Sequence, residues 1–476
     1  MTQSIRPLPE DAAHSPRRPD GDLDTLSVVE AAAAVAAGRV SATELMEAVL
    51  DRARRTEPLV HGYVHLDEDA ALAAAGEADR RQAEQGAAGP LQGVPVGVKD
   101  LIATADMPTS AGSRLLAGHR PTADAEVVRR LRRAGAVVVG KQWTHEFGCG
   151  MDEPPTRNPW DLTRYPGGST AGGGVSVAVG SSMAAIGTDG GGSIRKPAAI
   201  NGLVGLKPTR GLISTDGVIP GTTSLDHIGW LTRSVADAAL LLDVLAGGEA
   251  PRGPVTPGLG TADGPCLGGM RLGCPTYFFQ ALDPAIKRLT DRCLDALENA
   301  GAIILDLDIP ELDLAPEAHG TLMAAESYAL HARRLAESAD LYHPRTRRSL
   351  QAGEHVFGHE VAAAQQTRQR VEQAVAAAFE HHALDALCGP TVAIPAVPMD
   401  EMDPVRMLPA YCRLTLPFNL TGHPALSVPC GMSPAGLPAG FQIAARPYEE
   451  ATALRCAATV EAAGLWTSPR PTPDEG

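Results

Sequence analysis

Apolar residues recur along the chain in two patterns, a helical spacing and short uninterrupted runs. Two capping boxes, in which a serine precedes a glutamate by three positions, open Ala- and Val-rich stretches and predict helices over residues 27–38 and 41–55. Residues 124–134 carry apolar side chains three and four positions apart, which predicts another helix. The runs 94–98 and 136–139 are short and apolar, which is typical of buried strands.

The same alternation continues through the C-terminal half of the chain. A helix is expected over 284–299, a strand over 303–307 and a longer helical region over 318–380. Further apolar runs predict strands over 386–388, 425–428 and 440–443. Helices that alternate with short apolar strands are typical of α/β proteins, so we expect one large α/β domain.

The two ends of the chain differ in composition from the part between them. The first 22 residues are polar and rich in proline, and the last residues read Ser-Pro-Arg-Pro-Thr-Pro-Asp-Glu-Gly. Such segments are poorly ordered in most domains. We therefore expect a flexible arm over residues 1–22, a single domain over 23–465 and a flexible tail over 466–476.

Composition narrows the class of protein. The 476 residues carry a formal net charge of −15, which argues against a nucleic-acid partner. No run of about 18 apolar residues predicts a membrane-spanning helix, so no membrane partner is expected. The 8 cysteines form no C-x-x-C pair and no apolar leader precedes the domain, which indicates reduced thiols in a cytoplasmic protein.

Two stretches carry side chains that could do chemistry. Lys99 directly follows the apolar run 94–98, where burial would disfavour the ammonium form, lower the lysine pKa and turn the amine into a base. Ser193 follows three glycines. A glycine loop can turn its N–H groups toward one point beside the hydroxyl, as an oxyanion hole requires. A serine, fixed donors and a neutral lysine together predict an acyl-transfer site.

Other assignments of the catalytic groups stay open from these residues alone. Ser193 and Lys196 form an S-x-x-K motif, the acylation pair of penicillin-binding proteins and β-lactamases, although no S-D-N or K-T-G element follows. His145 and His227 lie near the same stretches, but no G-x-S-x-G motif supports a histidine-dependent triad.

A metal site and a non-catalytic role are further alternatives. His355 and His359 are four residues apart on an expected helix and could bind a metal, but they lack the H-E-x-x-H pattern, so a solvated face is the expected role. We expect no metal site and no cofactor. A catalytically idle scaffold is the remaining class, and the presence of every candidate catalytic side chain argues against it.

Three motifs together resemble those of one enzyme family. Residues 97–100 read Gly-Val-Lys-Asp, residues 167–173 read Gly-Gly-Ser-Thr-Ala-Gly-Gly, and residues 187–195 read Gly-Thr-Asp-Gly-Gly-Gly-Ser-Ile-Arg. They are similar to the signature of the amidase signature family of Ser–Ser–Lys hydrolases. The two serines are 24 positions apart, as in that family. The similarity extends over about residues 25–460, with a signature core over about 90–235.

The resemblance implies a fold and a set of roles. It implies a single α/β domain with a mixed, twisted β-sheet covered by helices on both faces. Ser193 would be the nucleophile, Ser169 a bridging serine that follows a cis peptide bond, and Lys99 the base. The oxyanion hole would consist of the N–H groups of Gly190, Gly191 and Gly192. Three residues would support the loops around it: Thr170, Asp189 and Arg195.

The resemblance also implies an activity. Members hydrolyse carbon–nitrogen bonds of amides through an acyl-enzyme without a cofactor, and we expect this activity to extend to esters or carbamates. The expected partners are a small-molecule amide, water and a second copy of the chain in a homodimer. The alternative is the glutaminase (amidase) subunit of a tRNA-dependent amidotransferase. Residues 323–360 do not resemble that subunit's arginine- and tyrosine-bearing segment and are more similar to stand-alone amidases.

The sequence departs from the family pattern beside the motifs, where substrate choice would be decided. Thr170 and Ala171 replace a serine and a glycine, and Gln142-Trp143 replaces Thr-Asn. We expect the pocket walls to come from residues 143–151, from the helices of 320–360 and from loops near 411–423. The lining residues that we expect are Trp143, Cys149, Gly150, Met151 and Tyr411. Their side chains favour an apolar or aryl substrate.

Overall fold

The computed structural model describes residues 22–87, 89–150, 154–247, 266–402, 410–467 and 470–473. The predicted arm over 1–22 lies outside the described residues except for its last residue. Beyond the predicted domain boundary at 465, Trp466 packs edge-on against Trp160, with ring centroids 5.7 Å apart. The Arg470 guanidinium donates to Asp24. The C-terminal residues that the structure describes therefore contact the body of the domain.

In the described part of the chain, eleven strands form one sheet with the order β1-β3-β2-β4-β6-β5-β10-β11-β9-β7-β8. The strands are β1 (Tyr63–Leu66), β2 (Pro95–Lys99), β3 (Val137–Gln142), β4 (Ala184–Thr188), β5 (Val204–Lys207), β6 (Ile228–Thr232), β7 (Arg271–Pro275), β8 (Ile303–Leu307), β9 (Ala386–Pro390), β10 (Ala425–Met432) and β11 (Pro438–Ala445). Strand β2 pairs in parallel with β3 and β4, and β7 in parallel with β8 and β9, while the other pairs are antiparallel. The predicted mixed sheet is confirmed.

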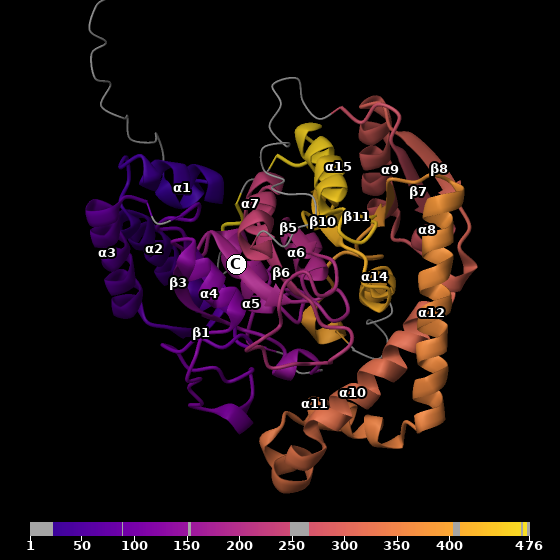
Figure 1. Ribbon diagram of the computed structural model, residues 1–476, viewed down its shortest axis with the longest axis horizontal. Helices are drawn as coiled ribbons and strands as arrows, with labels where there is room; N and C mark the ends of the chain where they lie inside the picture. Colours follow the sequence, from indigo (N-terminus) through magenta and orange to yellow (C-terminus); the bar gives the residue numbers. More distant parts are fainter. Residues whose placement is uncertain are drawn as a thin grey trace, which may run out of the picture.

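Helices cover both faces of this sheet (Figure 1). They are α1 (Val28–Ala36), α2 (Ala42–Val60), α3 (Glu68–Gln85), α4 (Glu126–Arg133), α5 (Ala171–Val179), α6 (Arg195–Asn201), α7 (Val235–Ala246), α8 (Thr276–Phe279), α9 (Pro284–Asn299), α10 (Ala315–Ser338), α11 (Pro344–Ala352), α12 (Gly358–His381), α14 (Leu416–Leu420) and α15 (Glu450–Ala462). Ala184 and Ile186 of β4 join the large core under α7, α9 and α15, whereas Ala185 joins a smaller core with α5 and α6. Successive strand residues point to opposite faces, so β4 separates the two helical layers.

The elements that the hydrophobic patterns predicted are present within a few residues of their predicted limits, and the other elements were not predicted. The capping boxes at Ser27 and Ser41 are present, and the helix of 284–299 and the strand of 303–307 have the predicted limits. Helix α5 was not predicted. Three of its first four residues are glycines, and a Cβ on Gly172 would lie 2.1 Å from the Gly62 carbonyl oxygen. Close packing, rather than helix propensity, therefore explains this helix.

The predicted helical region over 318–380 consists of three helices, α10, α11 and α12 (orange in Figure 1), that extend beyond the sheet. Helices α10 and α12 pack on each other and bury Leu322, Val371 and Val375 in a second large core.

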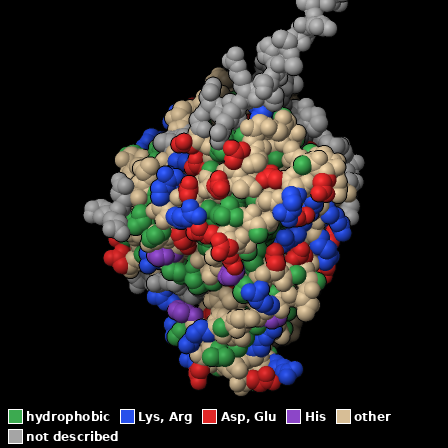
Figure 2. All heavy atoms as spheres, turned by 90° about the vertical axis from the view of Figure 1, so that its left-hand side faces the viewer, with side chains coloured by type: hydrophobic (Ala, Val, Ile, Leu, Met, Phe, Trp, Pro, Cys, Tyr) green, Lys and Arg blue, Asp and Glu red, His purple; other side chains and the backbone are tan. Residues whose placement is uncertain are grey.

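The outer face of the N-terminal helices carries interspersed acidic and basic side chains (Figure 2), with pairs such as Arg54 and Glu68. None of the helices described here combines the length and the apolar character that crossing a membrane requires.

Candidate active site

The sheet topology brings two of the sequence motifs to one edge. Strands β2 and β4 are parallel neighbours, so their carboxyl ends lie side by side. Lys99 ends β2 and Thr188 ends β4. Ser169 lies in the loop before α5, and Ser193 lies in the glycine loop between β4 and α6. The three predicted catalytic side chains therefore come from three connected segments at the same sheet edge.

Lys99 is fully buried, and its Nζ lies 2.8 Å from Ser169 Oγ and 2.8 Å from Thr188 Oγ1. Burial lowers the pKa of Lys99 to about 7. The carboxylates of Asp226 and Asp189 oppose this shift, and the positive charge of Lys196 adds to it. About half of the amine is therefore neutral at pH 7 and most of it is neutral above that pH, with a lone pair within reach of the Ser169 hydroxyl.

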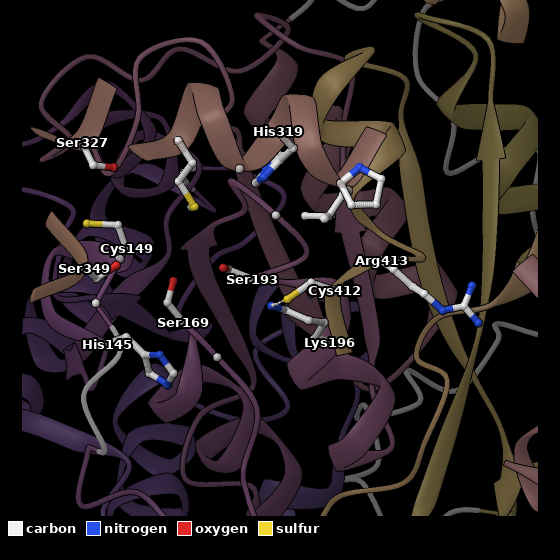
Figure 3. A pocket seen from close by; sticks show the side chains of 18 of the residues that line it. His145, Cys149, Ser169, Ser193, Lys196, His319, Ser327, Ser349, Cys412 and Arg413 are labelled. Carbon is white, nitrogen blue, oxygen red and sulfur yellow. Dashed lines mark hydrogen bonds between the residues drawn. The ribbon is translucent and has the colours of Figure 1, made fainter. Parts of the chain in front are cut away.

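The two serines face the same cavity (Figure 3). The Gly168–Ser169 peptide bond is cis, as the resemblance implied. Ser169 is 5% exposed and Ser193 is 8% exposed, so both hydroxyls are largely shielded from water. The Thr170 hydroxyl donates to the Thr188 carbonyl at 3.2 Å, and the Thr170 N–H donates to the Ser193 carbonyl at 3.3 Å. These hydrogen bonds tie the two serine loops to each other and to β4.

The three glycines before Ser193 do not have equivalent N–H groups. The Gly192 N–H donates to Asp189 Oδ1 at 2.6 Å. The N–H groups of Gly190 and Gly191 have no hydrogen-bond acceptor within the described residues. Gly192 has φ +102°, and a Cβ there would lie 2.3 Å from Thr415 Oγ1. Two of the three predicted oxyanion donors are thus available, and the third holds the loop in shape.

Asp189 and Arg195 form the buried support of this loop. Arg195 Nη2 lies 3.0 Å from Asp189 Oδ1, and both side chains are fully buried. Burial alone would raise the pKa of the Asp189 carboxyl, but the Arg195 charge and hydrogen bonds outweigh burial and lower this pKa below its usual range. Arg195 also donates to Gln442 and Asn419. The ion pair therefore connects the glycine loop to β11 and α14.

Two residues that hold the glycine loop were not found from the sequence. His319 on α10 lies with Nε2 2.7 Å from the Gly190 carbonyl oxygen, and the Thr415 hydroxyl donates to the Gly191 carbonyl at 3.0 Å. Burial lowers the pKa of His319 to about 4, so the ring is neutral at pH 7 and its Nε2–H donates. Neither residue lies near a motif, and no sequence signal marks them.

The serines open into a cavity of about 800 Å³ whose described lining is largely apolar. Among the residues that line it are Cys149, Gly150, Tyr165, Tyr277, Met323, Ser349, Leu350, Met399, Met402, Cys412 and Leu416. The predicted Cys149 and Gly150 are part of this lining, and Met151 lies outside the described residues.

Two residues predicted to line the pocket lie elsewhere. The Tyr411 hydroxyl donates to the Pro395 carbonyl at 2.7 Å, and its ring packs against Tyr165 in a core cluster. Trp143 directly follows β3. Its N–H donates to the Gly62 carbonyl, and its carbonyl accepts from the Gly172 N–H. Their backbone positions near the cavity did not determine the direction of their side chains.

Of the alternative catalytic residues, Lys196 and His145 line the same cavity as the serines, and His227 does not. Lys196 Nζ lies 2.9 Å from Cys412 Sγ. His227 is buried and bonds the Leu225 carbonyl, and burial lowers the pKa of His145 to about 3. His355 and His359 are exposed, and the described residues hold no group of three potential metal ligands.

Comparison with known proteins agrees with this geometry. A family model described as Amidase matches residues 44–454. The A subunit of the glutamyl-tRNA(Gln) amidotransferase of Chloroflexus aurantiacus is 40% identical, covering 94% of this chain and 99% of the relative. The peptide amidase of Stenotrophomonas maltophilia superposes with a TM-score of 0.81 at 32% identity, covering 94% of this chain and 99% of that one.

A third similar protein is the A subunit of the glutamyl-tRNA(Gln) amidotransferase of Thermotoga maritima. Its structure superposes with a TM-score of 0.77 at 27% identity, covering 96% of this chain and all of that one. The family match extends over nearly the whole chain. This chain therefore belongs to the amidase family and is an amide-hydrolysing enzyme.

Proposed function

We propose that the chain hydrolyses amides with Ser193 as nucleophile, Ser169 as proton bridge and Lys99 as base. The observation that carries this proposal is the position of a fully buried lysine amine 2.8 Å from Ser169 Oγ, at the cavity that also holds Ser193. Burial supplies the neutral amine that a base requires, and the cavity supplies access for a substrate.

The reaction follows from these positions. Lys99 Nζ accepts the Ser169 proton while Ser169 Oγ accepts the Ser193 proton, and Ser193 Oγ bonds to the substrate carbonyl carbon. The N–H groups of Gly190 and Gly191 stabilise the oxyanion that forms. The relay returns the proton to the leaving amine as the carbon–nitrogen bond breaks. Water, activated by the same relay, then hydrolyses the acyl-enzyme and restores the Ser193 hydroxyl.

The cavity favours a substrate with a large apolar part. Its volume of about 800 Å³ lies in the range of pockets for drug-sized ligands, whereas a side-chain amide such as glutamine is much smaller. The described lining includes Tyr277, Met323 and Leu416, which gain from contact with apolar groups. An aryl or long acyl amide, with activity on the corresponding carbamates or esters, fits this lining best.

Glutamine hydrolysis within a tRNA-dependent amidotransferase is the second candidate function. The 40% identity to the A subunit of such an enzyme over 94% of the chain favours it, compared with 32% identity to the peptide amidase. In that case the chain would need partner subunits to use the released ammonia. A zwitterionic substrate needs a buried partner for each charge. Asp313, a carboxylate of the described lining, is exposed to solvent, which supports the first candidate.

The test is a substrate panel on folded wild type, Ser193→Ala and Ser349→Ala. The panel holds aryl anilides of short and long acids, an aryl carbamate, an ester and glutamine. We expect Ser193→Ala to lose anilide hydrolysis by about 10⁴-fold or more. Ser349→Ala changes a serine of the same cavity and should keep most of the activity. Turnover of glutamine alone would establish the second candidate, and unchanged anilide hydrolysis in Ser193→Ala would exclude this nucleophile.

A further inference from the structure

The cavity contains a buried cation that the proposed proton relay does not use. Lys196 belongs to α6, three residues after Ser193, and its side chain lines the same cavity. The residue is only 8% exposed. Figure 3 shows its ammonium beside Cys412 and on the side of Ser193. Lys196 and Ser193 therefore border the same space, in which the bond to be cleaved would lie.

Two other buried cations of the described residues, unlike Lys196, have a carboxylate partner. Arg195 lies 3.0 Å from a carboxylate oxygen of Asp189, and Lys141 lies 3.4 Å from one of Asp100. Lys196 instead contacts the thiol sulfur of Cys412 at 2.9 Å, and no carboxylate of a described residue forms an ion pair with it. A buried ammonium is unfavourable unless an anion accompanies it. An anionic group that enters the cavity would supply this missing partner.

We propose that Lys196 binds a carboxylate of the substrate. The substrate class is then an amide that carries one carboxylate near the scissile bond and an apolar remainder against the cavity walls. This inference rests on the proposed function and deepens it. A carboxylate placed beside Lys196 gains a charge-assisted hydrogen bond in a site largely shielded from water, which a neutral group of the same shape lacks.

The same arrangement disfavours zwitterions. The carboxylate found in the described lining, Asp313, is exposed and so offers little to a buried substrate ammonium. Arg413 lines the cavity as well, but its guanidinium donates to the backbone carbonyls of Tyr277 and Gln280 and points away from the serines in Figure 3. Arg345, the remaining arginine of this lining, is only partly buried, so Lys196 is the buried cation among the described lining residues.

The experiment compares two anilides of equal chain length, the 4-nitroanilide of succinic acid, which keeps one free carboxylate, and the 4-nitroanilide of butyric acid, which is neutral. Wild type, Lys196→Met, Lys196→Arg and Ser193→Ala are assayed, each at a pH where its rate no longer changes. We expect wild type to prefer the carboxylate substrate about tenfold or more in kcat/KM. Lys196→Met should lose this preference while it keeps hydrolysis of the neutral anilide, and Lys196→Arg should retain it. Melting curves confirm that each variant is folded.

The outcomes separate this inference from the proposed function. Hydrolysis of both anilides without preference, lost in Ser193→Ala, would overturn the carboxylate site and leave the proposed function intact. If neither anilide is hydrolysed, the proposed amidase reaction is in doubt, and calorimetry with 4-phenylbutyrate and 4-phenylbutanol decides the inference. Tighter binding of the carboxylate by wild type, reduced about tenfold in Lys196→Met, supports it, whereas equal or absent binding of both refutes it.

Discussion

The signature core and the helical segment of residues 315–381 meet at one cavity but are built in different ways. In the core, Lys99, Asp189 and Arg195 are fully buried, and each has polar partners at hydrogen-bond distance. The helical segment contributes half-buried side chains such as Met323 and Ser349, which contact the cavity rather than the reacting atoms. Under the proposed function, the reaction depends on the signature core, where several hydrogen bonds fix each side chain. Substrate choice depends on the helical segment, where a side chain can be replaced without disturbing the reacting groups.

One residue connects the helical segment directly to the predicted oxyanion loop. His319 belongs to α10 of the helical segment, yet it donates to the Gly190 carbonyl in the core. In a trans peptide the N–H points opposite to the carbonyl, so this contact fixes the direction of the Gly191 N–H. The helical segment therefore supplies both substrate contacts and part of the oxyanion loop geometry.

Among the changes that compare the two regions, removing the proposed base of the signature core should have the largest effect. Lys99→Met keeps the length of the side chain but removes the lone pair that accepts the Ser169 proton. We expect kcat/KM for an anilide to fall by about 10³-fold, within the range that general base catalysis contributes. The matched change Lys196→Met, assayed at a pH where its rate no longer changes, should leave hydrolysis of a neutral anilide nearly intact. Equal losses in the two variants would contradict the assignment of Lys99 as base.

Lowering the pH should have the next largest effect. Lys99 acts as a base only when it is neutral, and its pKa is lowered to about 7. Below this pKa the amine gains a proton, so kcat/KM should fall about tenfold per pH unit, to roughly one hundredth at pH 5, and should level off above pH 8. A pH profile of kcat/KM measures this directly. Lys196→Met removes a charge that lowers the Lys99 pKa and should move the profile to higher pH.

The contact between the two regions can be broken at His319. His319→Phe removes the donor to Gly190, and the loop then holds the Gly191 N–H less firmly. We expect kcat to fall by roughly 10- to 100-fold with KM little changed, less than the loss of an oxyanion donor itself. His319→Gln can still donate and should recover part of the rate. A change in KM alone would mean that His319 only lines the cavity.

The smallest effect is expected within the helical segment. Met323→Ala removes apolar contact from the cavity wall without changing a residue of the signature core. The loss of a few buried methylene-sized groups should raise KM for an apolar anilide about tenfold and leave kcat unchanged. Steady-state kinetics with a long and a short acyl anilide test this, because the short substrate should be less affected. A fall in kcat would mean that the helical segment also affects the chemical step, which would contradict the proposed division of roles between the two regions.

The elements of the fold follow largely from local patterns. The capping boxes at Ser27 and Ser41, the apolar run that becomes β2 and the helix of 284–299 depend on residues a few positions apart, so the sequence predicts them. Helix α5 could not be predicted from local patterns. The backbone of β3 and of residue 62 packs so closely against this helix that a side chain would not fit, and only the folded chain shows this requirement for glycine.

The sequence by itself determined which side chains could do chemistry: a lysine after an apolar strand and serines in two glycine-rich loops are local features. Only the tertiary structure decided how they are used. Tyr411 packs into a core cluster, and the Gly192 N–H donates to Asp189. His319 reaches the glycine loop from a distant segment, and Cys412 reaches Lys196 in the same way. These contacts join residues up to more than two hundred positions apart, and only long-range packing specifies such pairs.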